Sequence, residues 1–450
     1  MEYDLLIRGG LVLTPDGVCA ADVAVADGAI AGVGPQLGGR AREEVDATGL
    51  HVLPGGIDMH VHCDEPGRTE WEGFATATAA LAAGGLTAFA DMPLNSTPAT
   101  VDADAFDRKV RAAAASARVD FALWGGLVPG RLGELEAMHA QGAIGFKAFM
   151  SETGMPDFRP ADDDTLLEGM RRAAALDALV AVHAENAAIV AARHERAVAA
   201  GRRDARSYLD SRPPVAELEA IARALTFSAD TGCRLHVVHV STADGVALIR
   251  QARADGVDAS WETATHFLAL TEDDVVRLGP VAKCAPVIRD ASNRARLWQH
   301  VADEPDAIVA SDRSPCPPEL KATDDFFAAW GGITGCQSTV HVLLDGVGRG
   351  RLDLAAASAA IAGNVAARLR LTGKGRIAVG CDADLALVDL DQAWSLTADE
   401  LRYRHRMSAL VGAPMRGAMR RVYSRGRLVA VDRDVVDDVR GRLVRPCAAG

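Results

Sequence analysis

The sequence predicts an α/β protein, a (β/α)8 barrel with a small β domain built from both ends of the chain. Between residues 51 and 373, short apolar strands alternate with helical segments, which is typical of parallel β/α units. The two ends, residues 1–50 and 374–450, resemble each other and differ from the middle. We therefore expect residues 51–373 to form the barrel and the two end segments to pair into one β unit.

The end segments carry short strands separated by glycine turns. Residues 5–7 and 11–13 flank Gly9 and Gly10, and residues 23–26 precede the pair Asp27 and Gly28. Near the other end, residues 383–388 are apolar and residues 421–429 alternate around Gly426. The similar texture of the two ends suggests that they share one sheet.

The middle segment provides eight candidate strands, the number that closes a (β/α)8 barrel. They are residues 53–62, 86–92, 119–127, 143–150, 178–185, 234–241, 258–263 and 307–311. Helices are expected over residues 74–83, 132–139, 164–176, 216–229 and 245–254. A doubly wound open sheet is the alternative, weakened because no Gly-x-Gly-x-x-Gly opens a helix.

Composition restricts the classes of partner. The chain has 450 residues and a net charge of −13, which disfavours nucleic acid and anionic membranes as partners. No apolar run approaches the ~20 residues of a membrane span, and the first residues do not read as a secretory signal. The eight cysteines show no C-x-x-C spacing, so we expect reduced thiols and a cytoplasmic protein.

Several polar side chains fall where apolar strands end. His60 and His62 end the first barrel strand, and residues two apart on a strand point to the same side. His183 and His239 end two later strands, and Asp312 follows the last. In a parallel barrel all C-terminal strand ends meet on one face, so these side chains should converge. Four imidazoles and a carboxylate suit Zn²⁺ or another borderline divalent ion.

Lys147 lies in an otherwise apolar strand. A buried ammonium is costly, so its pKa should fall and its amine become nucleophilic. Such an amine takes up CO2 as a carbamate, an anionic bridge between two metal ions. Taken singly, each histidine also fits a hydrogen-bonded core residue, and the lysine fits one that extends to solvent. The combination, on strands one, four, five, six and eight in chain order, favours the metal site.

With these residues, three longer segments make the sequence resemble the amidohydrolase superfamily, in the branch of cyclic amidases that holds hydantoinases, dihydroorotases and allantoinases. These segments are residues 5–10, 54–62 and 375–385. Within the branch, the sequence looks most like the allantoinases. The supporting stretches are residues 65–73, 91–95, 314–319 and 329–333.

The resemblance implies a metal-bearing barrel with a β-sandwich from both termini, and a hydrolase that opens the ring of allantoin to allantoate in purine catabolism. It implies two divalent ions, zinc foremost with cobalt, manganese, nickel or iron as alternatives. Their ligands would be His60, His62, carboxylated Lys147, His183, His239 and Asp312. Asp312 would serve as general base and then acid. Backbone near Ala285 and Gly332 would hold the ureide ring, Asn95 is a candidate contact, and homotetramers are usual.

Four positions depart from the family pattern: Asp64, Arg313, and Thr265 and Val287, which replace residues that are usually proline. Asp64 stands where dihydroorotases carry an arginine for the substrate carboxylate, and an aspartate would repel that group. Arg313 replaces a histidine that usually follows the metal-binding aspartate. We consider Arg313 a candidate substrate contact, or a salt-bridged residue turned out of the site. The alternative functions are a hydantoinase or dihydropyrimidinase, and a non-catalytic scaffold with the same fold.

Overall fold

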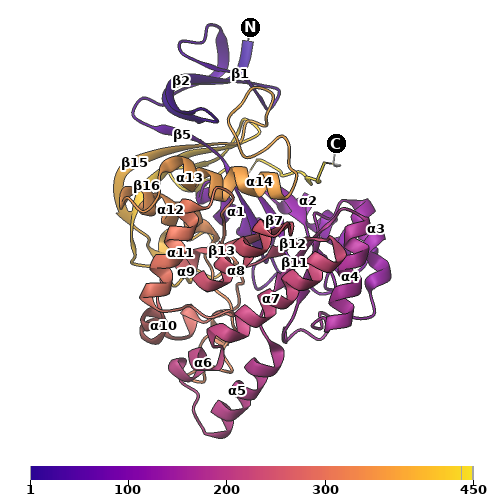
Figure 1. Cartoon of the computed structure of the whole chain (residues 1–450). Coiled ribbons are helices and arrows are strands. Elements are labelled where there is room, and N and C mark those ends of the chain that lie inside the picture. The colour runs from indigo at the N-terminus through magenta and orange to yellow at the C-terminus, as the bar shows by residue number, and fades with distance from the viewer. Residues whose placement is uncertain (1, 437, 448–450) are drawn as a thin grey trace.

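The computed structural model describes residues 2–436 and 438–447 (Figure 1). The N-terminal strands and the strands of the C-terminal segment lie near each other on one side of the barrel (Figure 1). Helices surround the barrel strands. The predicted α/β barrel with a β unit built from both ends is confirmed.

The two ends form one nine-stranded sheet within the described residues, ordered β18-β17-β16-β15-β5-β1-β2-β3, with β4 paired to β1. Its strands are β1 (Glu2–Thr14), β2 (Gly17–Ala26), β3 (Ala29–Gly34), β4 (Arg40–Asp46), β5 (His51–Pro54), β15 (Leu385–Ser395), β16 (Pro414–Ser424), β17 (Arg427–Val431) and β18 (Asp434–Val435). The sheet joins the ends through β5, which pairs in parallel with β1 and antiparallel with β15. It therefore reaches Pro54, and the domain boundaries at residues 51 and 374 stay a prediction.

The barrel strands are β6 (Gly56–Val61), β7 (Leu86–Asp91), β8 (Asp120–Leu123), β9 (Gly125–Gly126), β10 (Phe146–Phe149), β11 (Leu179–His183), β12 (Arg234–Val237), β13 (Ala259–Ala264) and β14 (Ile308–Ala310). The expected strand 119–127 is split at Trp124. Its first half pairs with β7 and its second half with β10. A parallel bridge between Val61 and Arg313, with a 2.8 Å bond from His62 N to Arg313 O, closes the barrel.

The helices are α1 (Phe74–Ala83), α2 (Ala103–Ser116), α3 (Leu135–Gln141), α4 (Asp163–Ala175), α5 (Ala187–Ala199), α6 (Ala205–Ser211), α7 (Pro214–Thr231), α8 (Ala243–Ala254), α9 (Thr265–Ala269), α10 (Glu272–Leu278), α11 (Ala291–Asp303), α12 (Thr339–Gly348), α13 (Leu354–Ser358) and α14 (Asn364–Arg368). The aspartates Asp102, Asp162 and Asp290 cap α2, α4 and α11 by accepting a bond from the backbone three residues on. In the described ranges, none of the helices has the length and apolar character needed to cross a membrane.

The five helices that the sequence predicts are present, and the expected helix 132–139 begins as a short 3-10 turn before α3. The strands expected at 5–7 and 11–13 are one strand, β1, with a register shift between Ile7 and Gly10. Residues 421–429 form a hairpin, in which β16 and β17 turn around Gly426. The left-handed backbone of Gly426, with φ of 68°, is favourable for glycine because it has no Cβ.

A buried ion cluster joins the terminal sheet to the barrel. The Lys374 ammonium lies 2.8 Å from Asp120, 2.9 Å from Asp382 and 2.7 Å from Asp384, and Arg425 also pairs with Asp120. The three carboxylates lie close enough together to hold a cation. Here the lysine and arginine supply the positive charge, so we assign the cluster a structural role.

Candidate metal centre

One end of the barrel gathers the six predicted ligands. His60 is in β6 and His62 follows it directly, Lys147 is in β10, and His183 ends β11. His239 and Asp312 each lie two residues beyond a strand end, those of β12 and β14. The backbone at both of these positions is left-handed, with φ of 39° for His239 and 45° for Asp312. Such strain in residues other than glycine concentrates at functional sites, where the surrounding fold holds it.

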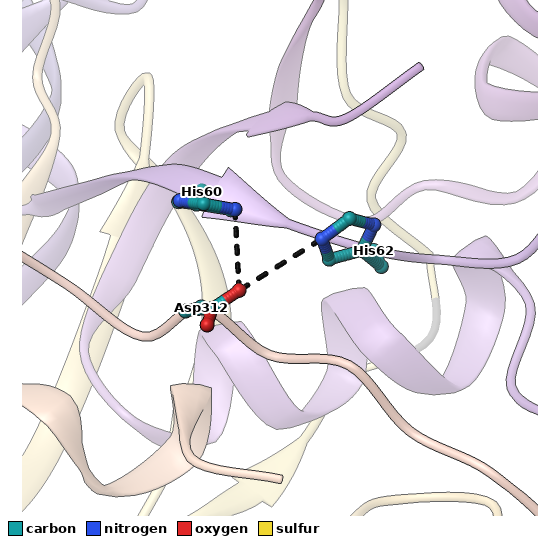
Figure 2. A group of neighbouring side chains, drawn as sticks. All are labelled: His60, His62 and Asp312. Atoms are coloured by element: carbon teal, nitrogen blue, oxygen red, sulfur yellow. Dashed lines mark ion pairs between the residues drawn. The ribbon is translucent and has the colours of Figure 1, made fainter. Parts of the chain in front are cut away.

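His60, His62 and Asp312 form the first group. Figure 2 shows both imidazoles turned toward the carboxylate, with Asp312 Oδ1 3.2 Å from His60 Nε2 and 3.8 Å from His62 Nε2. One ligand atom from each lies within 4.8 Å of the others, which suits coordination of a single cation. The two imidazoles are buried, while the Asp312 side chain is 13% exposed. The carboxylate is therefore the member of the group that a small molecule would reach.

His183 and His239 form a second group. Nδ1 of His183 lies 3.0 Å from Nε2 of His239, and their rings meet edge to face. The His239 ring centroid is 5.3 Å from that of His60, so the two groups are neighbours. Burial lowers the pKa of His60 to about 4. It also lowers the pKa of His183, and it lowers the pKa of His239 to well below the ordinary value. These imidazoles are therefore neutral near pH 7, the form that binds a metal.

Lys147 is buried, and among the described residues its Nζ has no hydrogen-bond partner. It lies 5.0 Å from the centroid of the Phe149 ring, which stacks on His183. Burial lowers the pKa of Lys147 to about 7, although Glu262 and Asp312 oppose the shift. An unpaired amine of this kind beside imidazoles and a carboxylate fits the carbamate chemistry expected for a two-metal site. The donor set as a whole therefore fits two divalent ions.

Two buried glutamates contact ring nitrogens of the histidines, and the sequence analysis did not single them out. Glu262 Oε1 lies 2.5 Å from His60 Nδ1, and its other oxygen lies 3.2 Å from His236 Nε2. Glu185 lies 2.9 Å from His183 Nε2 and also pairs with Arg212. The signal that could have found them is an acidic residue within or directly after a buried strand.

The candidate substrate contacts lie on loops at the same end of the barrel. Asn95 Nδ2 donates to Ser314 Oγ at 3.4 Å, and a Cβ on Gly332 would lie 2.3 Å from the Ser314 carbonyl oxygen. The structure therefore brings Asn95 and Gly332 close to Ser314. Ala285, which is half-buried, lies on the loop before α11. The ammonium of Lys321 joins the two loops by donating to Gly332 O at 2.8 Å and to Lys283 O at 3.4 Å.

Arg313 does not join these contacts. Its side chain is fully buried and pairs with Glu72, its Nη1 donates to His62 O at 3.0 Å, and its guanidinium lies 5.0 Å from the Tyr403 ring centroid. This geometry corresponds to the salt-bridged alternative, because the guanidinium is already occupied by a carboxylate, a carbonyl and an aromatic face. We therefore do not retain Arg313 as a candidate substrate contact.

The model of the Amidohydrolase family matches residues 51–429. The chain belongs to this family. It is 54% identical to an allantoinase of Rubrobacter xylanophilus over 445 residues, which cover 99% of this chain and 98% of that protein. It is 51% identical to an allantoinase of Solibacter usitatus, with 99% and 97% covered. The predicted resemblance to the allantoinases is thus confirmed.

Solved structures agree with this family assignment. An L-hydantoinase (dihydropyrimidinase) from Arthrobacter aurescens superposes with a TM-score of 0.94 at 35% identity, covering 96% of this chain and 97% of that one. A D-hydantoinase superposes with a TM-score of 0.88 at 29% identity, covering 96% of both chains. This amidohydrolase is therefore a hydrolase of the kind that acts on cyclic amides.

Proposed function

We propose that this chain hydrolyses the ring amide of allantoin to allantoate, a step of purine catabolism. The observation that carries the proposal is the convergence of four histidines with lowered pKa values, one carboxylate and an unpaired buried Lys147 at one end of the barrel. The allantoinase relatives at 54% and 51% identity support the choice of ring.

We propose that the site holds two divalent ions, bound by His60, His62, carboxylated Lys147, His183, His239 and Asp312. Zinc suits imidazole and carboxylate ligands best, and cobalt, manganese, nickel and iron are alternatives. When bound, such ions generate hydroxide from water at neutral pH and polarise a carbonyl.

The chain's own groups then handle the proton and the ring. Asp312 is the partly exposed member of the site. It would accept the proton of the attacking water and pass it to the leaving ring nitrogen. Asn95 and the backbone of Ala285 and Gly332 would hold the ureide, because they lie on loops at the same barrel end.

Asp64 supports an uncharged, N–H-rich ring over a substrate that carries a carboxylate. It follows β6 at the same barrel end, is 1% exposed, and neither carboxyl oxygen has a hydrogen-bond partner among the described residues. The position supplies no positive charge to bind the carboxylate of dihydroorotate, and burial raises the pKa of Asp64 well above its ordinary value. A hydantoinase activity is the second candidate, favoured by the structural likeness to the Arthrobacter L-hydantoinase.

We also propose a homotetramer in the cytoplasm. All eight cysteines are free thiols, which suits a reducing compartment. Light scattering of the purified protein tests the tetramer, since a mass other than four chains would contradict it.

The function is tested by ring opening of racemic allantoin, hydantoin, dihydrouracil and dihydroorotate after reconstitution with Zn²⁺, Co²⁺ or Mn²⁺ and bicarbonate. We expect turnover of allantoin, loss of it in Lys147→Ala, and none with dihydroorotate. Lys374→Met/Asp384→Asn serves as the matched control, because it removes a buried ion pair whose residues are not among the six proposed ligands. Turnover of hydantoin alone would move the specificity, and inactivity without bound metal would favour the scaffold.

A further inference from the structure

Arg313 lies next to the metal ligand Asp312, and its backbone closes the barrel. Its carbonyl accepts from His62 N at 2.8 Å, and its Nη1 donates to the His62 carbonyl at 3.0 Å. Arg313 therefore bonds both the backbone N–H and the backbone carbonyl of His62, and it is covalently joined to Asp312. Two ligands of the first metal group are thus fixed relative to each other through this one residue.

The guanidinium also reaches Glu72 at the end of the segment 64–73, which follows β6. Both side chains are fully buried. Glu72 Oε1 accepts from Arg404 N at 3.2 Å, and the Glu72 carbonyl accepts from Arg404 Nε at 2.7 Å. His405 Nε2 lies 3.0 Å from the Glu70 carbonyl. The Arg313–Glu72 pair therefore joins the metal site to residues 400–408, which we call the strap.

The strap continues to the segment after Gly332. Tyr403, whose ring lies under the Arg313 guanidinium, accepts from Gln337 N through its hydroxyl at 3.0 Å. Ser408 Oγ donates to Thr334 O at 3.2 Å. The strap thus fastens two loops at the rim of the site, and Arg313 is the point where it meets the metal ligands.

We propose that Arg313, paired with Glu72, is a positioning residue that fixes His62 and Asp312 for metal binding by anchoring them to the strap. The guanidinium suits this role because its fork reaches a carbonyl and a carboxylate at once while its flat face stacks on an aromatic ring. An ammonium could serve only as a point charge, and an imidazole is shorter with two nitrogens. The inference rests on the proposed metal site.

The test compares the full-length parent with Arg313→Lys and the double variant Arg313→Met/Glu72→Gln, which removes both buried charges together and so leaves neither unpaired. The matched control is Lys374→Met/Asp384→Asn, which removes a buried ion pair of the structural cluster. Three quantities are measured: the Zn²⁺ affinity by chelator competition, the visible spectrum of the Co²⁺ form, and hydrogen exchange over residues 64–73.

We expect the double variant to bind Zn²⁺ about tenfold more weakly, with a changed Co²⁺ spectrum and faster exchange over residues 64–73. Arg313→Lys should fall between it and the parent, and the control should lose thermal stability alone. If the double variant does not fold, Arg313→Lys, which keeps a positive charge beside Glu72, carries the comparison. Zn²⁺ affinity within twofold of the parent and an unchanged Co²⁺ spectrum would overturn the inference.

This outcome is separable from that of the proposed function. A parent that binds zinc but opens none of the four rings would refute the amidase assignment, while the affinity and spectra would still decide the role of Arg313. An active parent whose variants keep their metal affinity would refute only the inference.

Discussion

Replacing Glu262 by glutamine should weaken metal binding without disturbing the fold. To bind a metal through Nε2, a neutral His60 must carry its proton on Nδ1, which lies 2.5 Å from Glu262 Oε1. The same glutamate accepts from His239 N at 3.3 Å and contacts His236 Nε2 at 3.2 Å. Burial alone would raise the pKa of Glu262, but His60 and His236 outweigh it and hold that pKa well below its ordinary range. The side chain is therefore an anion that orients His60.

Glutamine keeps the size and one acceptor of Glu262 but loses the charge. Supporting groups behind a metal ligand commonly contribute 10- to 100-fold in metal affinity, so we expect a loss of about 1.4–2.7 kcal/mol in Zn²⁺ binding. Competition with a chromophoric chelator measures it. Glu217→Gln is the matched control, because Glu217 is equally buried but bonds Ser241 and touches none of the six proposed ligands. Zinc affinity within threefold of the parent in Glu262→Gln, or an equal loss in the control, would refute this reasoning.

Three further outcomes follow from the structure. Burial lowers the pKa of His341 to about 4. Between pH 6.5 and 4 the unfolded chain therefore binds more protons than the folded chain, and the free energy of unfolding falls as the pH falls. Measured by urea unfolding at pH 7.5 and at pH 5, the free energy of unfolding should fall by about 2 kcal/mol less in His341→Gln than in the parent. The Cβ of Gly332→Ala would meet the Ser314 carbonyl oxygen and so displace the loop. We expect kcat/KM for the cyclic substrate to fall at least about tenfold. An unchanged kcat/KM would contradict this prediction. Removal of the bound metal with a chelator should lower Tm. If the free metal concentration was about 1,000 times Kd before chelation, the free energy of unfolding should fall by ~4 kcal/mol. A Tm that the chelator leaves unchanged would argue against a resident ion.

The strand ends were predictable because they depend on patterns of short range. His60 and His62 share a side through the two-residue period of a strand, and His183 and Asp312 reach the same face through parallel topology alone. Both rules need only the local sequence and the number of strands. The structure places His60 and His62 within 3.8 Å of Asp312 and places His183 3.0 Å from His239, whose ring centroid is 5.3 Å from that of His60.

What the sequence could not provide depends on contacts between distant segments. The direction of Arg313 is decided by Glu72 and Tyr403, which come from loops far away in the chain. The break in the third barrel strand occurs where Trp124 N bonds to Asp91 O, while its Nε1 donates to Met59 O, and no local pattern signals this change of partner. The parallel pairing of β1 with β4 likewise joins strands whose order in the sheet the sequence leaves open.

The unpaired polar atoms of the barrel end also argue for a bound cation. Lys147 Nζ and both oxygens of Asp64 are buried without a hydrogen-bond partner in the described residues. Each such atom costs about 1–3 kcal/mol of folding free energy, a large share of the stability of a domain. A fold retains such unpaired atoms where the binding of an ion or a substrate compensates for their cost in folding free energy. In the structural cluster, by contrast, the buried Lys374 is paired with three carboxylates. The contrast between the two clusters separates a structural ion network from a site built to receive metal and substrate.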